Sequence, residues 1–436
     1  MPDFTITDRL RAVFDTLGLE RMHFAAQSPG DIAEFIGQAP QRVGGIVLLA
    51  PPRMDPLPFE TLGDRVLYIL PSGGMLHRTA EAVLPRLPDA RRVTLENYDA
   101  ESWSDIAADR TDIASLISQH LSNLDGGAAI AAGEDHGEIA GIRYHASGNG
   151  PPLVLTPLAF APSQWQTVVP ELAGHFRVIV VSGPHLGMLA LLEQRAALTG
   201  WRRMCETLFD DLALDPGDRV LDVGCGSGAV ARHFVEHTGG RNPLTGVDLC
   251  AYFVDEARHG AAAAGIADTV GFKTASAEQL PFERNTYDAA YSITVLEECH
   301  AERAVTELVR VVKPGGRVAI IVRAIDMPQW WNLPVRDDIR AKIEMPAASV
   351  HADGVATAAI YRVALAAGLR PLSLYPYLVA TEGTTGPVFE YPEAYALAQL
   401  MPDEQAAYLA AKAQAQADGT LFFTRGHHCF IGEVID

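Results

Sequence analysis

The sequence is poor in lysine, has few cysteines and contains no long apolar run. Only four of its 436 residues are lysine (Lys273, Lys313, Lys342 and Lys412), and the formal charge is −20. Without a basic stripe we expect no nucleic-acid or membrane-surface partner. The five cysteines lack CxxC spacing, which favours reduced thiols and a cytoplasmic location. No segment approaches the roughly 20 apolar residues of a spanning helix, and the first ten residues have no export-signal pattern.

Apolar strand-like runs alternate with helical stretches along the whole chain. Most of these runs are apolar without strict alternation, which is typical of parallel strands buried on both faces. The fold class is therefore α/β, and 436 residues exceed one ordinary core. We divide the chain at its glycine- and proline-rich joins into four segments: 1–125, a linker at 126–138, 139–190 and 191–436.

A glycine-rich turn follows the buried run Val220-Leu221-Asp222-Val223. It reads Gly224-Cys225-Gly226-Ser227-Gly228 and leads into a helical segment. Glycines allow a ligand to approach the backbone closely beside a helix N-terminus. Asp248 ends the next strand-like run, twenty residues after Gly228, where a carboxylate can accept hydrogen bonds from ribose hydroxyls. Together the two features predict a nucleotide-type cofactor site.

Residues 200–436 resemble class I S-adenosylmethionine-dependent methyltransferases, especially the branch that includes ubiquinone and menaquinone biosynthesis enzymes. The motifs in family order are LDVGCGSG, VDL, SAEQLPF, YDAAYSITVLEE and ELVRVVKPGGRV. The resemblance implies a Rossmann-like, mostly parallel seven-stranded sheet. It also implies methyl transfer from S-adenosylmethionine to O, N, C or S of a small molecule in specialised metabolism, with S-adenosylhomocysteine as product. A non-methylating enzyme of the same fold and a cofactor-binding regulatory protein are the alternatives.

The resemblance also implies the residues of the cofactor site. Gly224, Gly226 and Gly228 would surround the methionine part, and Asp248 would hold the ribose. Ser276 stands at the adenine edge, where relatives more often carry Asp. The full predicted set is Asp222, Gly224, Cys225, Gly226, Ser227, Gly228, Asp248, Leu249, Ser276, Ala277, Glu278 and Ser292.

Candidates for a general base follow the strand-like run DAAYSIT, because ligands of open α/β sheets bind at the carboxyl ends of strands. They are Tyr291, Ser292, Glu297, Glu298 and His300, and many relatives carry a histidine where this chain has Glu298. The alternative is that Glu297 and Glu298 form a solvated first turn of the following helix, where carboxylates suit the dipole.

Four side chains are candidates for contact with the methyl acceptor: Trp201, Trp330, Trp331 and His427. Aromatic rings at 330–331 could stack on a flat acceptor, or they could pack beneath the C-terminal helices. In the strand-like run around His427, alternation places His427 and Cys429 on one face and His428 on the other. These neighbours lack the spacing of metal ligands, so we expect no metal.

Residues 6–121 resemble the C-terminal half of an α/β-hydrolase, and residues 138–187 resemble its N-terminal half. Ser28 occupies the nucleophile place, but Pro29 has no N–H for an oxyanion, and the expected acid and histidine are missing. We therefore predict a circularly permuted, non-catalytic domain that folds from both segments and serves dimerisation or substrate gating. A homodimer through this domain is the expected assembly.

Overall fold

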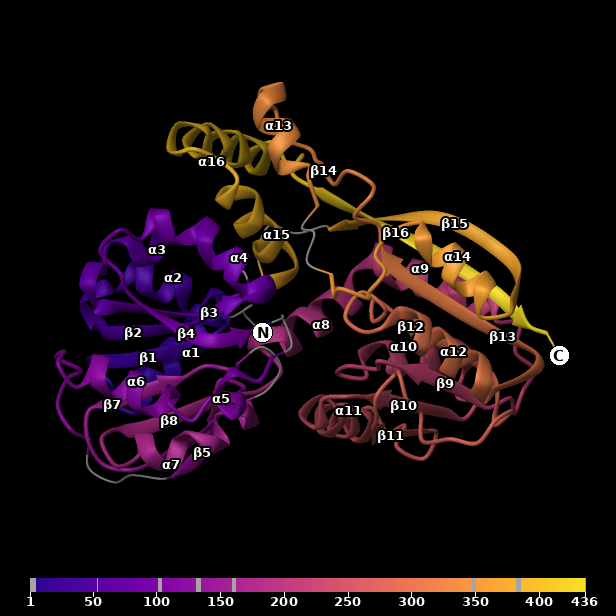
Figure 1. Ribbon diagram of the computed structural model, residues 1–436, viewed down its shortest axis with the longest axis horizontal. Coiled ribbons are helices and arrows are strands. Elements are labelled where there is room, and N and C mark those ends of the chain that lie inside the picture. The colour runs from indigo at the N-terminus through magenta and orange to yellow at the C-terminus, as the bar shows by residue number, and fades with distance from the viewer. Residues whose placement is uncertain are drawn as a thin grey trace. The chain divides into compact units, whose positions relative to one another are not determined.

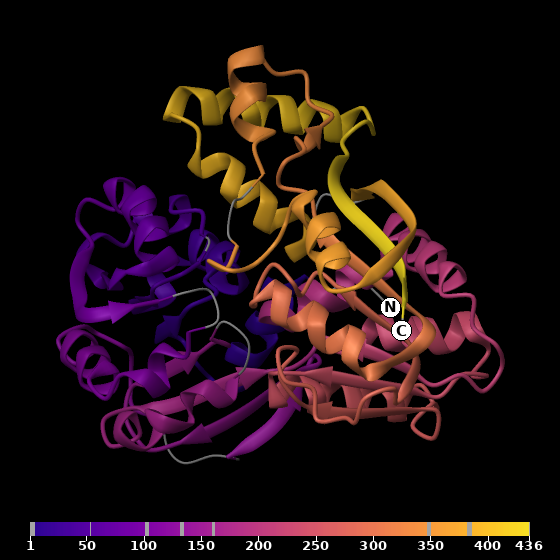
Figure 2. The ribbon, with the colours of Figure 1, turned by 45° about the vertical axis from the view of Figure 1, so that its right-hand side comes forward.

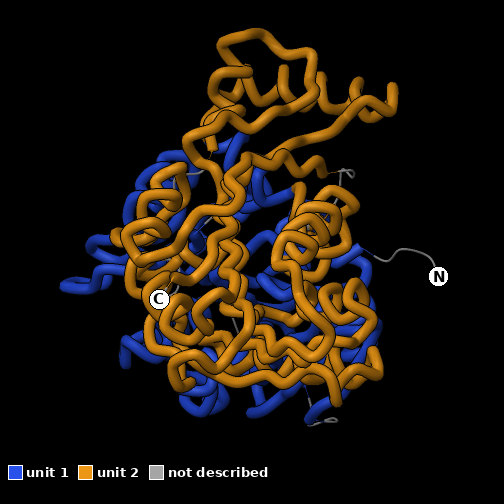
Figure 3. Tube along the Cα trace, turned by 90° about the vertical axis from the view of Figure 1, so that its right-hand side faces the viewer, with its two compact units in different colours: residues 1–191, 390–398 blue, residues 192–389, 399–436 orange. Residues whose placement is uncertain are grey.

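Two compact units make up the chain (Figure 3). The computed structural model describes residues 5–52, 54–100, 104–130, 135–158, 162–346, 350–381 and 386–435. Unit 1 comprises Met1–Leu191 and Glu390–Ala398, and unit 2 comprises Leu192–Phe389 and Gln399–Asp436. The division falls one residue after the expected boundary at residue 190. The membership of residues 390–398 in unit 1 was not anticipated.

Unit 1 is built on one eight-stranded sheet of order β4-β3-β2-β1-β7-β8-β6-β5 (Figure 1). Its strands are β1 (Met22–Ala26), β2 (Val43–Leu49), β3 (Val66–Gly73), β4 (Arg91–Asp99), β5 (His136–Ile139), β6 (Ile142–Ser147), β7 (Pro152–Leu155) and β8 (Arg177–Ser182). β1 pairs in parallel with both β2 and β7, so the two separated sequence segments share one sheet. β6 is antiparallel to both of its neighbours.

Helices cover both faces of this sheet with separate apolar cores. The helices are α1 (Ile6–Thr16), α2 (Gly30–Gln38), α3 (Leu57–Glu60), α4 (Gly74–Val83), α5 (Ile106–Asp109), α6 (Ile113–Leu121) and α7 (Val169–Leu172). On one face Phe14 of α1, Phe24 of β1 and Phe35 of α2 meet edge to face or tilted. On the other face Trp165 is fully buried.

The expected linker at 126–138 needs a correction. Residues 131–134 lie outside the described part of the chain, but residues 136–138 form most of strand β5. The last residues of the segment are therefore part of the sheet, where β5 pairs antiparallel with β6. Glycine and alanine content alone did not distinguish this edge strand from a linker.

Unit 2 contains a second sheet, of order β11-β10-β9-β12-β13-β16-β14, with β15 paired to β16. The strands are β9 (Val220–Val223), β10 (Leu244–Asp248), β11 (Val270–Thr274), β12 (Tyr287–Ile293), β13 (Val312–Arg323), β14 (Trp330–Trp331), β15 (Leu369–Thr381) and β16 (Phe423–Val434). β9 to β13 pair in parallel, whereas β16 is antiparallel to β13 and β15. The sheet has eight strands, one more than expected, because the short strand β14 adds to the edge of β16.

The faces of the second sheet are covered by two groups of helices. α9 (Thr199–Asp211), α10 (Ala229–Thr238) and α11 (Ala251–Ala263) pack on one face, and α12 (Ala301–Val311) and α14 (Ala359–Ala366) pack on the other. Figure 2 shows α13 (Asp337–Ile343) and α16 (Pro402–Ala417) beside each other, away from this sheet. α8 (Gly187–Ala197) and α15 (Pro387–Ala398) each contain residues of both units.

No helix in the described ranges is both long and apolar enough to cross a membrane.

Candidate functional site

The glycine-rich turn leaves β9 at its carboxyl end and enters α10. Gly226 has a backbone φ of +51°, and a Cβ at this position would lie 2.9 Å from Leu192 Cδ1. Gly224 has a φ of +81°, and a Cβ there would collide with the Val295 side chain. An alanine at either position would be strained and overpacked, so the turn requires glycine for its path.

Asp248, the last residue of β10, holds this turn in place. Its Oδ2 accepts a hydrogen bond from the Gly226 N–H at 2.8 Å, and its Oδ1 accepts one from the Cys250 N–H at 2.9 Å. Burial raises the pKa of this carboxyl, while the backbone donors oppose the shift. The sequence-predicted loop and acid are therefore brought into direct contact.

A pocket lies at the carboxyl ends of β9 and β12, within unit 2. It is lined by Leu192, Arg195, Ala196, Trp201, Asp222, Gly224, Cys225, Gly226, Ser227, Ala229, Val230 and Ile293. The indole N–H of Trp201 and the hydroxyl of Ser227 are buried and have no hydrogen-bond partner among the described residues. Buried polar atoms are almost always paired, so these two indicate a polar ligand. Leu192 and Ala196 were not predicted from the sequence, because they lie in α8, which crosses the predicted domain boundary and carries no motif.

Arg195 and His427 flank Trp201. The Arg195 guanidinium lies 4.2 Å from the Trp201 ring centre, and the His427 ring meets the indole edge to face at 5.5 Å. Burial lowers the pKa of Arg195 to about 10, while Glu297 opposes that shift. Burial, followed by the charge of Arg195, lowers the pKa of His427 to about 3, so His427 is neutral. As expected from alternation, His428 lies on the opposite face, where its Nδ1 contacts the Tyr361 hydroxyl.

Asp222 of β9 is a buried acid in the wall of the pocket. Burial raises its pKa to about 8, although the hydroxyl of Tyr291 lies against it and favours the ionised form. The Tyr291 ring is fully buried between Phe209 and Phe234. The expectation that Tyr291 acts as a base is therefore corrected: burial raises its pKa well above the usual value, and it supports Asp222 from inside the core.

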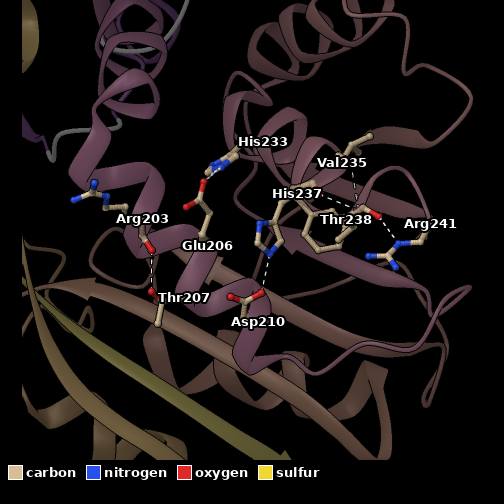
Figure 4. A network of polar contacts seen from close by, with 10 residues as sticks. Arg203, Glu206, Thr207, Asp210, His233, Val235, His237, Thr238 and Arg241 are labelled. Atoms are coloured by element: carbon tan, nitrogen blue, oxygen red, sulfur yellow. Dashed lines mark hydrogen bonds and ion pairs between the residues drawn. The ribbon is translucent and has the colours of Figure 1, made fainter.

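Two histidine–carboxylate pairs dock α9, which carries Trp201, onto α10 (Figure 4). His233 Nε2 lies 2.9 Å from Glu206 Oε1, and His237 Nε2 lies 2.8 Å from Asp210 Oδ1. The two carboxylates are four residues apart on α9, and the two histidines are four residues apart on α10. The two pairs therefore lie about one helical turn apart. This double contact fixes the helix that forms one wall of the pocket.

The alternative that Glu297 and Glu298 form a solvated first turn of a helix is wrong. α12 begins at Ala301, with His300 as its N-cap residue. Glu297 is fully buried, and burial raises its pKa to about 7 against the opposing charge of Arg323. Glu298 is 45% exposed and lies 3.3 Å from Arg323 Nη2. Of these two candidate residues, Glu297 is therefore the buried one.

The other predicted cofactor residues do not line the pocket. Gly228 is the N-cap of α10, and the Leu249 side chain is 70% exposed beside Asp248. The Ser276 hydroxyl accepts from the N–H of Glu278, one residue beyond Ala277. The carboxylate of Glu278 accepts from the His300 N–H. Ser292 is corrected to a structural role, because it is fully buried and donates to the Val223 carbonyl.

Of the two tryptophans of β14, only Trp330 is exposed. Trp331 is fully buried between Phe389, Tyr408 and Phe423, and its indole N–H donates to the Ile343 carbonyl. The expectation that Trp331 stacks on an acceptor is therefore corrected to packing beneath the C-terminal helices. Trp330 is 51% exposed and meets Phe422 edge to face.

Comparison with protein families identifies the central part of unit 2. Residues 221–320, which include the turn, Asp222, Asp248 and Glu297, match the family model described as a methyltransferase domain. The chain carries a methyltransferase domain. This domain extends from β9 into β13 and contains the carboxyl ends of the strands at which the pocket opens.

Similar curated proteins cover about a quarter of the chain. Methyltransferase GfsG of Streptomyces halstedii is 33% identical over 119 residues, which are 27% of this chain and 42% of that protein. Ubiquinone/menaquinone biosynthesis C-methyltransferase UbiE of Brucella anthropi is 39% identical over 103 residues, 23% of this chain and 39% of that protein. The chain therefore spans less than half the length of these relatives.

Two solved structures are similar over about half of the chain. The [4+2]-cyclase SpnF matches with a TM-score of 0.36 and 20% identity, covering 54% of this chain and 82% of that one. A geranyl diphosphate methyltransferase in complex with SAM matches with a TM-score of 0.33 and 19% identity, covering 54% of this chain and 85% of that one.

Proposed function

We propose that this protein transfers a methyl group from S-adenosylmethionine to O, N, C or S of a small molecule in specialised metabolism. The pocket of unit 2 carries the proposal. There the glycine turn and the unpartnered Trp201 N–H meet at the carboxyl ends of parallel strands, and Asp248 accepts a hydrogen bond from the Gly226 N–H of this turn. The match of residues 221–320 to a methyltransferase domain supports it.

The residues of the pocket fit this cofactor. The unpartnered Ser227 hydroxyl and Trp201 N–H supply polar contacts. Each oxygen of Asp248 accepts one backbone N–H and retains a lone pair for a ribose hydroxyl. The exposed Leu249 would cover the adenine.

S-adenosylmethionine supplies a methyl group already activated on a sulfonium sulfur. The protein therefore has to exclude water, align the acceptor and remove a proton where the acceptor carries one. Trp201 and Ile293 present apolar surface to the pocket. Burial raises the pKa of Asp222 to about 8, and a cationic ligand beside it would favour its ionised form. These tasks need no covalent intermediate with the protein.

Calorimetric titration of the purified chain with S-adenosylmethionine tests the cofactor, and release of S-adenosylhomocysteine in the presence of cell extract tests turnover. Saturable binding and product release support methyl transfer. Binding without turnover on any extract favours a regulatory protein, and absence of binding by the folded chain contradicts both functions.

We further propose that unit 1 is a circularly permuted α/β-hydrolase sheet without hydrolase activity. If residues 136–182 are placed before residues 22–99, the observed strand order becomes 1-2-4-3-5-6-7-8, that of an α/β-hydrolase. Ser28 follows β1 in the nucleophile position, but its φ is not positive and Pro29 begins the next helix without an N–H to donate.

The proposed role of unit 1 is dimerisation or substrate gating. Sedimentation of the full chain at several concentrations tests the first role: a dimer supports dimerisation, and a monomer at all concentrations leaves gating as the remaining role. Assays with simple acyl esters test the absence of hydrolysis, and turnover that is lost in Ser28→Ala would contradict the proposal.

A further inference from the structure

Arg195 of α8 brings an unpaired guanidinium to the pocket of unit 2. The guanidinium stacks on the Trp201 ring, 4.2 Å from its centre, and both residues line the pocket. It forms no hydrogen bond, and no ion pair within 4.0 Å, with any residue that the structure describes. Burial lowers the pKa of Arg195 to about 10, so the group is still charged at neutral pH. A partly buried cation without a counter-charge is costly, so its place in a pocket indicates an anionic ligand.

Two acidic side chains of this region are held by other arginines. Glu193, two residues before Arg195 on α8, pairs with Arg232 of α10. Glu297 pairs with Arg323 at the end of β13, with 3.6 Å between Oε1 and Nε. Neither acid forms an ion pair with Arg195, which leaves the donors of its guanidinium for a ligand.

Two neutral donors accompany the guanidinium. The Trp201 indole N–H belongs to the ring on which Arg195 stacks, and the Ser227 hydroxyl comes from the glycine-rich turn. Both groups are buried in residues that line the pocket, and neither has a partner in the described part of the chain. A guanidinium offers two parallel N–H donors that match the two oxygens of a carboxylate, and further N–H and O–H donors complete the shell of such an anion.

The charges of the pocket suit an anion with a single negative charge. Among the described residues that line it, Arg195 is the only basic side chain and Asp222 the only acidic one. A phosphate group carries about −1.5 to −2 charges, more than one guanidinium neutralises, and an ionised Asp222 would repel it. A carboxylate therefore fits better than a phosphate.

We propose that Arg195, the Trp201 N–H and the Ser227 hydroxyl form a carboxylate-binding site in this pocket. The identity of the ligand rests on the function proposed above: the carboxylate belongs to the amino-acid end of S-adenosylmethionine or to an acidic methyl acceptor. In both cases Arg195 fixes one end of the ligand beside the glycine-rich turn. Arg195 lies outside residues 221–320, so the match to the methyltransferase domain does not assign this role.

S-adenosylmethionine and its decarboxylated form test the first source, because the two ligands differ only in the carboxylate. Calorimetric titration of the full chain with each ligand gives the ratio of their dissociation constants. A change in the structure of the pocket alters both affinities, whereas a lost contact with the carboxylate alters the ratio. Comparing the ratio between the wild type and a variant therefore isolates the contact, as in a double-mutant cycle.

Three variants make the measurement specific. Arg195→Met removes the charge and keeps a long apolar side chain against Trp201. Arg195→Lys keeps the charge but loses the paired donors of the guanidinium. Arg203→Met is the matched control, because Arg203 is an exposed arginine of α9 that does not line the pocket.

We expect the wild type to bind the decarboxylated ligand about 10–100-fold more weakly than S-adenosylmethionine, since hydrogen bonds between charged groups are lost. The ratio should fall to about threefold or less in Arg195→Met, fall in part in Arg195→Lys, and persist in Arg203→Met.

Benzoate, titrated into the chain saturated with S-adenosylhomocysteine, tests the second source. Saturable benzoate binding that is lost in Arg195→Met and kept in Arg203→Met would assign the site to a carboxylate of the methyl acceptor. The proposal is overturned if neither the ligand ratio nor benzoate binding differs between the wild type and Arg195→Met. If the folded wild type binds neither adenosyl ligand, the proposed cofactor function fails instead, and benzoate titration of the free chain decides the role of Arg195 by the same comparison.

Discussion

Replacement of Asp248 by alanine separates a structural from a ligand-binding role at the glycine turn. The carboxylate accepts two backbone N–H groups, those of Gly226 and Cys250. Hydrogen bonds to charged groups contribute about 1.5–3 kcal/mol each, and hydration of the freed amides recovers a part. We expect the free energy of unfolding to fall by about 2–4 kcal/mol. Loss of two ribose contacts of about 1.5 kcal/mol each weakens binding about 100-fold.

Urea unfolding measures the free energy of unfolding. Calorimetric titration with S-adenosylhomocysteine, without urea and at a temperature where each variant is folded, measures the affinity. Asp248→Asn retains one acceptor oxygen and should fall between the wild type and Asp248→Ala in both assays. The matched control is Asp255→Ala, which removes an exposed carboxylate paired with Arg258 in the first half of α11. Affinity of Asp248→Ala within about threefold of the wild type would refute the ribose assignment.

Three further substitutions test other parts of the account. Trp331→Ala leaves a cavity at a buried aromatic site, so the free energy of unfolding, measured in urea, should fall by about 3–5 kcal/mol. A fall below about 1 kcal/mol would contradict the packing role. His427 has its pKa lowered to about 3, chiefly by burial, whereas an unfolded histidine titrates near 6.5. The free energy of unfolding therefore falls as the pH falls from about 6.5 towards 3. His427→Gln should reduce this fall, as measured by urea unfolding at several pH values. An unchanged pH dependence would contradict the lowered pKa of His427. Ser28→Ala should leave methyl transfer and stability unchanged, and loss of S-adenosylhomocysteine release with the fold preserved would contradict an inert unit 1.

Much of the fold was predictable because parallel strands leave a strong signal. The buried runs that end at Val223, Asp248 and Ile293 are mostly apolar, and each forms a strand. The glycine turn and Asp248 were also predictable, since close backbone approach and ribose binding restrict residue type. Strand β5 was missed because an exposed edge strand of four residues carries little apolar pattern.

The burial of Glu297 could not be predicted because burial depends on the ends of neighbouring elements. Glu297 and Glu298 are adjacent in sequence and identical in chemistry, and only the start of α12 at Ala301 and the amide of Arg323 distinguish them. Trp331 shows the same limit: its partners Phe389 and Tyr408 lie 58 and 77 residues further along the chain, so no local pattern indicates whether it packs or binds.

A crystal structure of the chain with S-adenosylhomocysteine tests the central claim most directly. The account predicts the ligand in the pocket of unit 2, with its ribose hydroxyls within hydrogen-bonding distance of Asp248 and its amino-acid end beside Ser227 and Trp201. A ligand bound elsewhere, or a pocket that stays empty at saturating ligand, would contradict it.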